Sequence, residues 1–353
     1  MATIVAGRCE NYEVSGLREF FARSLADLGL SFEGCKVLLK PNLLSGKPPE
    51  KAVNTHPLFI QALAEVFLEK KCTVFVGDSP GYESTERALR KSGIMEVVRR
   101  LKLLIAHFER RVPKANRGIS PYREFIFGEE PRDYDLVVNV PKLKSHVLMG
   151  LTAGVKNTFG FVPSLEKAKW HLRCGTDKRL FASLLIDINS VVKPALTVLD
   201  GIVAMDGGGP SHGRVRNLGL VVLSDDDIAL DDYLERILSV PYPLPVSSVA
   251  RENGLLREAM VIDREPPEIG SFLVPEGDRT AWNLPYLVRE AARTAFTRKP
   301  RCDARKCTAC RTCADVCASR ALTLVDGVVS INYKKCIRCY CCAEMCPVGA
   351  ITV

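Results

Sequence analysis

The sequence predicts an α/β protein with a mostly parallel sheet and helices on both faces, followed by a small C-terminal α+β domain. Two observations predict the larger part. Apolar segments of strand length alternate with amphipathic segments of helical length, and polar residues follow most of the apolar segments. A third observation, a cysteine-rich internal repeat, sets residues 302–353 apart. We therefore expect an α/β domain at 1–250, an extension and linker at 251–301, and the small domain at 302–353.

The elements follow from the alternation in chain order. Strands are expected at 3–8, 36–43, 72–80, from 134 onward, near Asp200 within 195–210, and at 218–224. Helices are expected at 17–30, 57–71 with Pro57 in the first turn, after Ser84, at 178–192, through 230–238 and near 284–297. The strand that starts at 134 is expected to run into a polar loop that reaches His146.

The composition is that of a globular protein, with 353 residues of which 47% are hydrophobic and 25% charged. The formal net charge is +8, but the basic run from Arg87 to Arg117 has the pattern of a solvated helix and loop, so no nucleic-acid partner is expected. The N-terminus lacks the pattern of a signal peptide, and no apolar segment approaches the ~20 residues of a membrane helix. We expect a cytoplasmic protein without membrane contact.

The cysteines of the small domain form two runs with the same spacing, C-x2-C-x2-C-x3-C. The first is Cys307, Cys310, Cys313 and Cys317; the second is Cys336, Cys339, Cys342 and Cys346, and each cysteine recurs 29 residues later. The apolar alternation between the runs surrounds Asp326-Gly327, which predicts a hairpin. The small domain is therefore an internal duplication.

Three chemistries use such thiols. Disulfides suit small secreted scaffolds, and structural zinc usually takes two separated C-x2-C pairs. Three cysteines at successive x2 intervals and a fourth after x3 instead fit an iron–sulfur cluster, in which the fourth cysteine of each run serves the other cluster. The spacing thus predicts two [4Fe–4S] clusters, with these ligands: Cys307, Cys310, Cys313 and Cys346 for cluster one, and Cys336, Cys339, Cys342 and Cys317 for cluster two.

On these residues the segment 302–353 resembles a bacterial-type ferredoxin with two [4Fe–4S] clusters. The resemblance implies one-electron transfer, a redox partner protein that donates or accepts electrons, and anaerobic metabolism. The first run departs from the ferredoxin pattern, because Ala318 stands where a proline usually follows the last cysteine. Cys302 and Cys341 fall outside the pattern and are interpreted as spare thiols.

Polar signatures follow five of the expected strands, at Lys40–Asn42, Gly77–Ser79, Lys142–His146, Asp200-Gly201 and Ser224-Asp225. Ligands of open α/β sheets bind where strands end, so these signatures predict a site there; ordinary turns are the alternative. The candidate catalytic residues are Lys142, Lys144, His146 and Lys156. The candidate substrate-binding residues are Lys40, Asn42, Asp78, Asn157 and Asp200. We expect the lysines to form one cationic pocket for an anionic small molecule, with a basic surface loop as the alternative.

Several ordered motifs also resemble the family called domain of unknown function 362. They are "KPNLL", "NTHP", "GDSPG", "NVPKLKSH", "GLTAGVKNTFG", "DGIVAMDGGGP" and "SDDDIALD", and they span about residues 1–250. The resemblance implies the α/β architecture with an appended ferredoxin module, and no reaction.

Together these observations favour an iron–sulfur electron-transfer protein whose α/β domain binds an anionic molecule or docks a partner. The alternative is a ferredoxin-dependent reductase or a cofactor-maturation enzyme, an iron–sulfur oxidoreductase with its active site where the strands end. The sequence predicts no oligomeric state.

Overall fold

The structure, a computed structural model, describes residues 1–275 and 298–353. The predicted helix near 284–297 lies outside the described residues. The main sheet has the order β12-β1-β11-β10-β7-β2-β3-β4, with β8 paired to β10 and β9 paired to β8. Its strands are β1 (Ala2–Arg8), β2 (Lys36–Pro41), β3 (Thr73–Val76), β4 (Leu104–Ile105), β7 (Leu136–Val140), β8 (Lys142–His146), β9 (Gly150–Thr152), β10 (Leu196–Asp206), β11 (Arg214–Ser224) and β12 (Ala259–Arg264).

Most neighbouring strands in this sheet are parallel, which confirms the predicted fold class. The antiparallel exceptions are β11, which opposes both β1 and β10, and the β8–β9 pair. A separate hairpin joins β5 (Val112–Ala115) to β6 (Glu124–Phe127). The expected extension at 251–301 contributes β12, which adds an edge strand parallel to β1.

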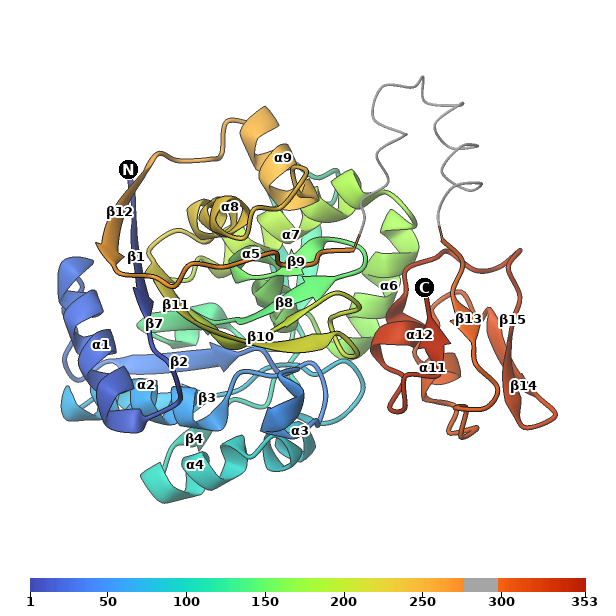
Figure 1. The fold of residues 1–353 in the computed structure, drawn as a ribbon, viewed down its shortest axis with the longest axis horizontal. Helices are drawn as coiled ribbons and strands as arrows, with labels where there is room; N and C mark the ends of the chain where they lie inside the picture. The colour runs from blue at the N-terminus through green and yellow to red at the C-terminus, as the bar shows by residue number, and fades with distance from the viewer. Residues whose placement is uncertain (276–297) are drawn as a thin grey trace.

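Helices cover both faces of the sheet (Figure 1). Alternation along β2 shows why: Val37 and Leu39 enter one hydrophobic cluster, whereas Leu38 between them enters another. One face carries α1 (Val14–Asp27), α2 (Pro57–Glu69), α3 (Thr85–Lys91) and α4 (Ile94–Leu101). The other carries α5 (Gly154–Asn157), α6 (Ser164–Cys174), α7 (Lys178–Val192), α8 (Asp227–Ile237) and α9 (Pro245–Glu252).

The polar loop expected before His146 is wrong, because this segment forms the buried strand β8. Strand β10 does not end at Asp200; it pairs first with β7 and then, from Asp200 onward, with β8. The backbone of the segment therefore finds its hydrogen-bond partners in a sheet rather than in a ligand.

One of the five polar signatures, at Ser224, lies at the opposite end of the strands from the others. Ser224 pairs with Thr197 near the start of β10, because β11 runs antiparallel to β10. Asp226 nearby caps the N-terminus of α8, because its side chain accepts the backbone N–H groups of Ile228 and Ala229, so this polar segment is a helix start.

The C-terminal module repeats one unit. Helices α11 (Thr312–Asp315) and α12 (Cys341–Glu344) occupy equivalent positions, 29 residues apart. The predicted hairpin joins β14 (Leu322–Val325) to β15 (Val328–Ile331), with positive φ at Asp326 and Gly327. Strand β13 (Arg301–Cys302) pairs with β16 (Ile351–Thr352).

The module packs beside α6 and the end of the β10–β11 hairpin (Figure 1). His212 Nε2 lies 2.8 Å from the carbonyl oxygen of Cys346, and Lys47 Nζ donates to the carbonyl of Pro347 at 2.8 Å. The Tyr82 hydroxyl donates to Asp315 at 3.3 Å. Among the described residues, no helix has the length and apolar character needed to cross a membrane.

Candidate functional site: a cavity between the two modules

The cysteines of the module form two groups. Cys307, Cys310, Cys313 and Cys346 line one small cavity. Cys317 lies beside cysteines of the second run: burial and then the charges of Cys339, Cys336, Cys317 and Cys313 raise the pKa of Cys342. This arrangement is compatible with the predicted crossed ligand sets, and crowded thiolates that raise one another's pKa fit a cationic metal centre.

No three His, Cys, Asp or Glu side chains within residues 1–275 and 298–353 are placed to hold a single metal ion. Each thiolate of a [4Fe–4S] cluster binds its own iron, so this finding concerns mononuclear sites. The ligand set remains a prediction.

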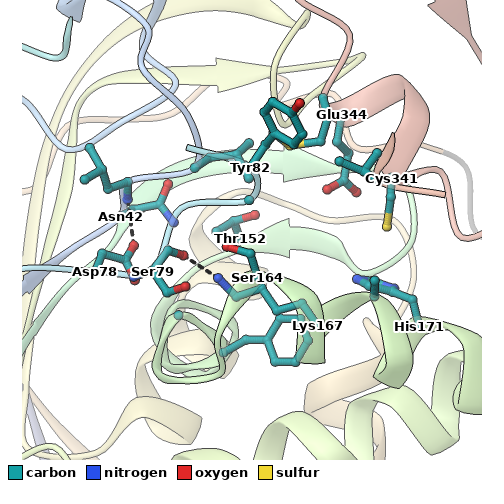
Figure 2. Close-up of a pocket in the computed structure, with 18 of the residues that line it drawn as sticks. Asn42, Asp78, Ser79, Tyr82, Thr152, Ser164, Lys167, His171, Cys341 and Glu344 are labelled. Carbon is teal, nitrogen blue, oxygen red and sulfur yellow. Dashed lines mark hydrogen bonds between the residues drawn. The ribbon is translucent and has the colours of Figure 1, made fainter. Parts of the chain in front are cut away.

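A larger cavity of about 310 Å³ opens between the two modules (Figure 2). Figure 2 shows Cys341 and Glu344 of α12 facing His171 and Lys167 of α6 across it. Its lining residues come mainly from the segments after β2 and β3, from β9, α5, α6, α11 and α12. The polar ones are Asn42, Asp78, Ser79, Tyr82, Thr152, Lys156, Asn157, Ser164, Lys167, His171, Asp315, Cys341 and Glu344.

Two buried ion pairs are formed by predicted site residues. Lys40 Nζ is 2.8 Å from Asp78 Oδ1, and the other oxygen of Asp78 accepts from the backbone N–H of Leu43 at 2.9 Å. Lys142 Nζ donates to Asp200 Oδ2 and to the Tyr12 hydroxyl, both at 2.8 Å. Burial lowers the pKa of each lysine, and its partner carboxylate opposes the change. In each pair the charge of the lysine is neutralised by its partner carboxylate.

The remaining lysines are less well compensated. No carboxylate of the described residues forms an ion pair with Lys144, Lys156 or Lys167. Burial holds the pKa of Lys144 well below its usual value, and the neighbouring charge of Lys156 lowers it further. Burial also lowers the pKa of Lys156, against the attraction of Glu344. Positive charges gathered with so few counter-charges favour an anion among them.

Glu344 connects the module to this cationic group. Its Oε1 lies 3.0 Å from His146 Nε2. His146 Nδ1 accepts the backbone N–H groups of Leu148 and Met149 at 3.1 and 3.2 Å, so the proton of the neutral ring sits on Nε2, toward Glu344. Burial, followed by the charge of Lys156, lowers the pKa of His146 to about 4. The ring is therefore neutral at neutral pH.

Sequence reasoning missed Lys167, Thr152, Cys341 and Glu344 as site residues. Lys167 donates to the carbonyl of Ser79, and burial lowers its pKa to about 7. Burial likewise lowers the pKa of His171 to about 4. The helical spacing of Lys167 and His171, four residues apart on α6, was the available signal, because it places both on one face.

Besides Glu344 Oε1, which lies opposite His146, two buried polar atoms of the cavity wall have no hydrogen-bond partner among the described residues: Asn42 Oδ1 and Thr152 Oγ1. The amide of Asn42 donates to Asn157 Oδ1 at 2.8 Å, and Asn157 donates to Asn139 Oδ1 at 2.8 Å, so the chain of amides leaves Asn42 Oδ1 available to accept. Buried polar atoms are normally satisfied, so these two mark where a ligand would supply the missing partners.

A family profile described as "Domain of unknown function (DUF362)" matches residues 37–234, more than half of the chain. The chain belongs to this family. A second profile, "4Fe-4S binding domain", matches residues 329–352, so the DUF362 domain is joined to an iron–sulfur module.

The chain is similar to the "Thylakoid-associated protein sll1697" of Synechocystis sp. (strain ATCC 27184 / PCC 6803 / Kazusa). The two are 35% identical over 253 residues, which cover 70% of this chain and 78% of that protein. Among solved structures, the lactate racemase apoprotein from Thermoanaerobacterium thermosaccharolyticum matches with a TM-score of 0.43 and 12% identity. That match covers 69% of this chain and 58% of the racemase chain.

The predicted site residues of the DUF362 domain fall into two places. Asn42, Asp78, Lys156 and Asn157 line the cavity. Lys40 pairs with Asp78 at its wall, and His146 contacts Glu344, while Lys144 donates to the carbonyl of Val53. Lys142 and Asp200 do not line the cavity; they form a separate buried cluster with Tyr12, whose ring stacks on His56 at 3.7 Å.

Proposed function

We propose that this DUF362 protein is an electron-transfer protein with two [4Fe–4S] clusters, and that it binds an anionic small molecule in the cavity between its modules. The observation that carries the proposal is the cavity itself. Lysines at and behind its wall outnumber the buried carboxylates, and two buried polar atoms there lack partners. Its volume of about 310 Å³ suits a small organic anion.

Each residue of the cavity makes a different contact with the anion. Lys156 and Lys167 supply positive charge, Asn42 Oδ1 accepts a hydrogen bond, and Thr152 Oγ1 donates or accepts one. When bound, a [4Fe–4S] cluster supplies one electron at a time. Val316 and Cys341, which line the cavity, directly adjoin the predicted cluster-two ligands Cys317 and Cys342. An anion in the cavity would therefore lie next to the second predicted cluster.

A second candidate function, reduction of the bound anion, is favoured by one observation. The pKa of Lys167 is lowered to about 7, so its ammonium group can give up a proton near neutral pH. A reductase needs such a proton source beside its substrate, whereas a simple carrier does not.

Native mass spectrometry of anaerobically purified protein tests the proposal. We expect about eight irons and eight sulfides per chain, and a released anion or stabilisation by added small carboxylates or phosphates. Lys156→Met should abolish anion binding without changing the iron content. The matched control is Lys169→Met, because Lys169 is exposed on α6 and pairs with Glu166. Equal binding by wild type and Lys156→Met would overturn the anion site.

A further inference from the structure

The duplication allows the two cluster loops to be compared position by position. In the first loop Thr308, Cys310 and Arg311 are exposed. Their equivalents in the second loop are Ile337, Cys339 and Tyr340, and Tyr340 is buried. The first loop is therefore open to solvent, whereas the equivalent loop around the second run of cysteines is covered.

The covered loop faces the DUF362 domain. Cys341 and Glu344, on either side of the predicted ligand Cys342, line the same cavity as Lys156 of the DUF362 domain. The second cluster site is therefore next to the cavity, while the first has an exposed cysteine at the surface.

The surface around Cys310 is basic with an apolar centre. Arg311, Pro347 and Val348 line the same small cavity as Cys310, and Val348 is 45% exposed. Lys306 precedes the ligand Cys307 and is exposed, and Lys47 of the DUF362 domain reaches Pro347. We call Lys47, Lys306, Arg311, Pro347 and Val348 the Cys310 surface.

The positive charge is local to this surface rather than a property of the whole module. Residues 302–353 contain seven Lys and Arg against four Asp and Glu, a net charge of +3, to which the preceding Arg298, Lys299 and Arg301 add three. Oxidised clusters with their thiolates add about −2 each, which brings the module itself to about −1 and residues 298–353 to about +2.

We propose that the Cys310 surface is the docking site of an acidic one-electron carrier protein, which exchanges electrons with cluster one, and that cluster two serves the cavity. The inference rests on the proposed electron-transfer function. Redox partners form small, transient interfaces whose encounter is steered by complementary charge. An apolar centre rimmed by lysine and arginine, over the most exposed predicted ligand, has this character.

The test uses full-length anaerobic holoprotein and flavodoxin, an acidic one-electron carrier, as the probe. Stopped-flow absorbance measures reduction of the clusters by flavodoxin hydroquinone, which gives up one electron per event. Calorimetry measures binding of oxidised flavodoxin. The test variant is Lys306→Glu with Arg311→Glu. The matched control is Lys334→Glu with Lys335→Glu, which changes the charge equally on the second loop.

We expect the test variant to lower the bimolecular rate constant about tenfold and to remove most of its salt dependence, while the control stays within about twofold. If the rate constant fell equally in both variants, or fell in neither, the proposed docking site would be overturned. So would a test variant that loses binding to anionic vesicles or DNA but keeps its rate with flavodoxin. If dithionite fails to bleach the clusters, the proposed electron transfer itself fails; if dithionite bleaches them, a negative result concerns docking alone.

Discussion

Lys167 shows how a single buried side chain can make binding depend on pH. It reaches from α6 to the carbonyl of Ser79, and the charged groups that act on it are Asp78, which favours its protonation, and Lys40 and Lys156, which oppose it. Burial is the largest effect, and the pKa falls to about 7. Small changes in pH near neutrality therefore change the charge of the cavity.

We predict that anion affinity falls as the pH rises from 6 to 8. Below pH 7 Lys167 is protonated and attracts the anion, and above pH 7 it loses its charge. A bound anion raises the pKa, which shifts the loss upward. Affinity measured against pH should flatten in Lys167→Arg, since arginine stays charged. If the affinity of Lys167→Arg depended on pH as that of the wild type does, a group other than Lys167 would be responsible for the pH dependence.

Gly160 illustrates the tight packing behind the cavity. A Cβ atom at this position would collide with Asp78 Oδ1 and Lys40 Nζ. We predict that Gly160→Ala lowers the free energy of unfolding by about 1–3 kcal/mol through overpacking. Urea titration measures it, with Gly270→Ala as the control because nothing lies within 4 Å of a Cβ there. Equal stability of the two variants would contradict the packing argument.

At the scale of elements, β8 decides what the lysines of the segment 142–146 can do. As a strand of the sheet it buries Lys142, Lys144 and His146, and it pairs Lys142 with Asp200 in register. A loop would have left these side chains free to move toward a ligand. We therefore expect Lys142 to contribute to stability rather than to anion binding.

Lys142→Met should lower the free energy of unfolding by about 3–5 kcal/mol, because it leaves Asp200 buried without its charge partner. Adding Asp200→Asn should recover part of the loss, since the amide removes the unpaired charge. Chemical denaturation of both variants measures the effect. Anion affinity that is lost in Lys142→Met at full stability would instead place Lys142 in the site.

The sequence was sufficient to predict the alternation of strands and helices, because apolar periodicity is local information. It could not predict that β10 continues past Asp200, since the new partner β8 becomes available only where β7 ends. It also missed that Ser224 lies at the opposite end of the strands, because the direction of β11 depends on its neighbours. Five of the lining residues, Glu344 and Cys341 among them, come from the iron–sulfur module, more than 150 residues beyond Lys156 in the sequence, and no local pattern indicates that contact.

At the scale of the whole molecule, the two cysteine runs are predicted to exchange one ligand each. Cys346 of the second run lies in the cavity formed by the first, and Cys317 lies beside Cys336 and Cys342. We predict that Cys317→Ala gives the paramagnetic resonance spectrum of Cys336→Ala, whereas Cys346→Ala gives that of Cys307→Ala. Iron analysis of each variant accompanies the spectra. If the spectrum of Cys317→Ala instead matched that of Cys307→Ala, each cluster would take all four ligands from one run.

Residues of both modules form the cavity wall, and this limits which ferredoxin modules could replace the present one. A ferredoxin module taken from another protein would bring its own residue to the position of Glu344, opposite His146 and Lys156. Without a carboxylate there, the cationic side of the DUF362 domain would meet an uncharged or positive surface. The two segments must therefore be inherited as a matched pair, although each has its own hydrophobic core.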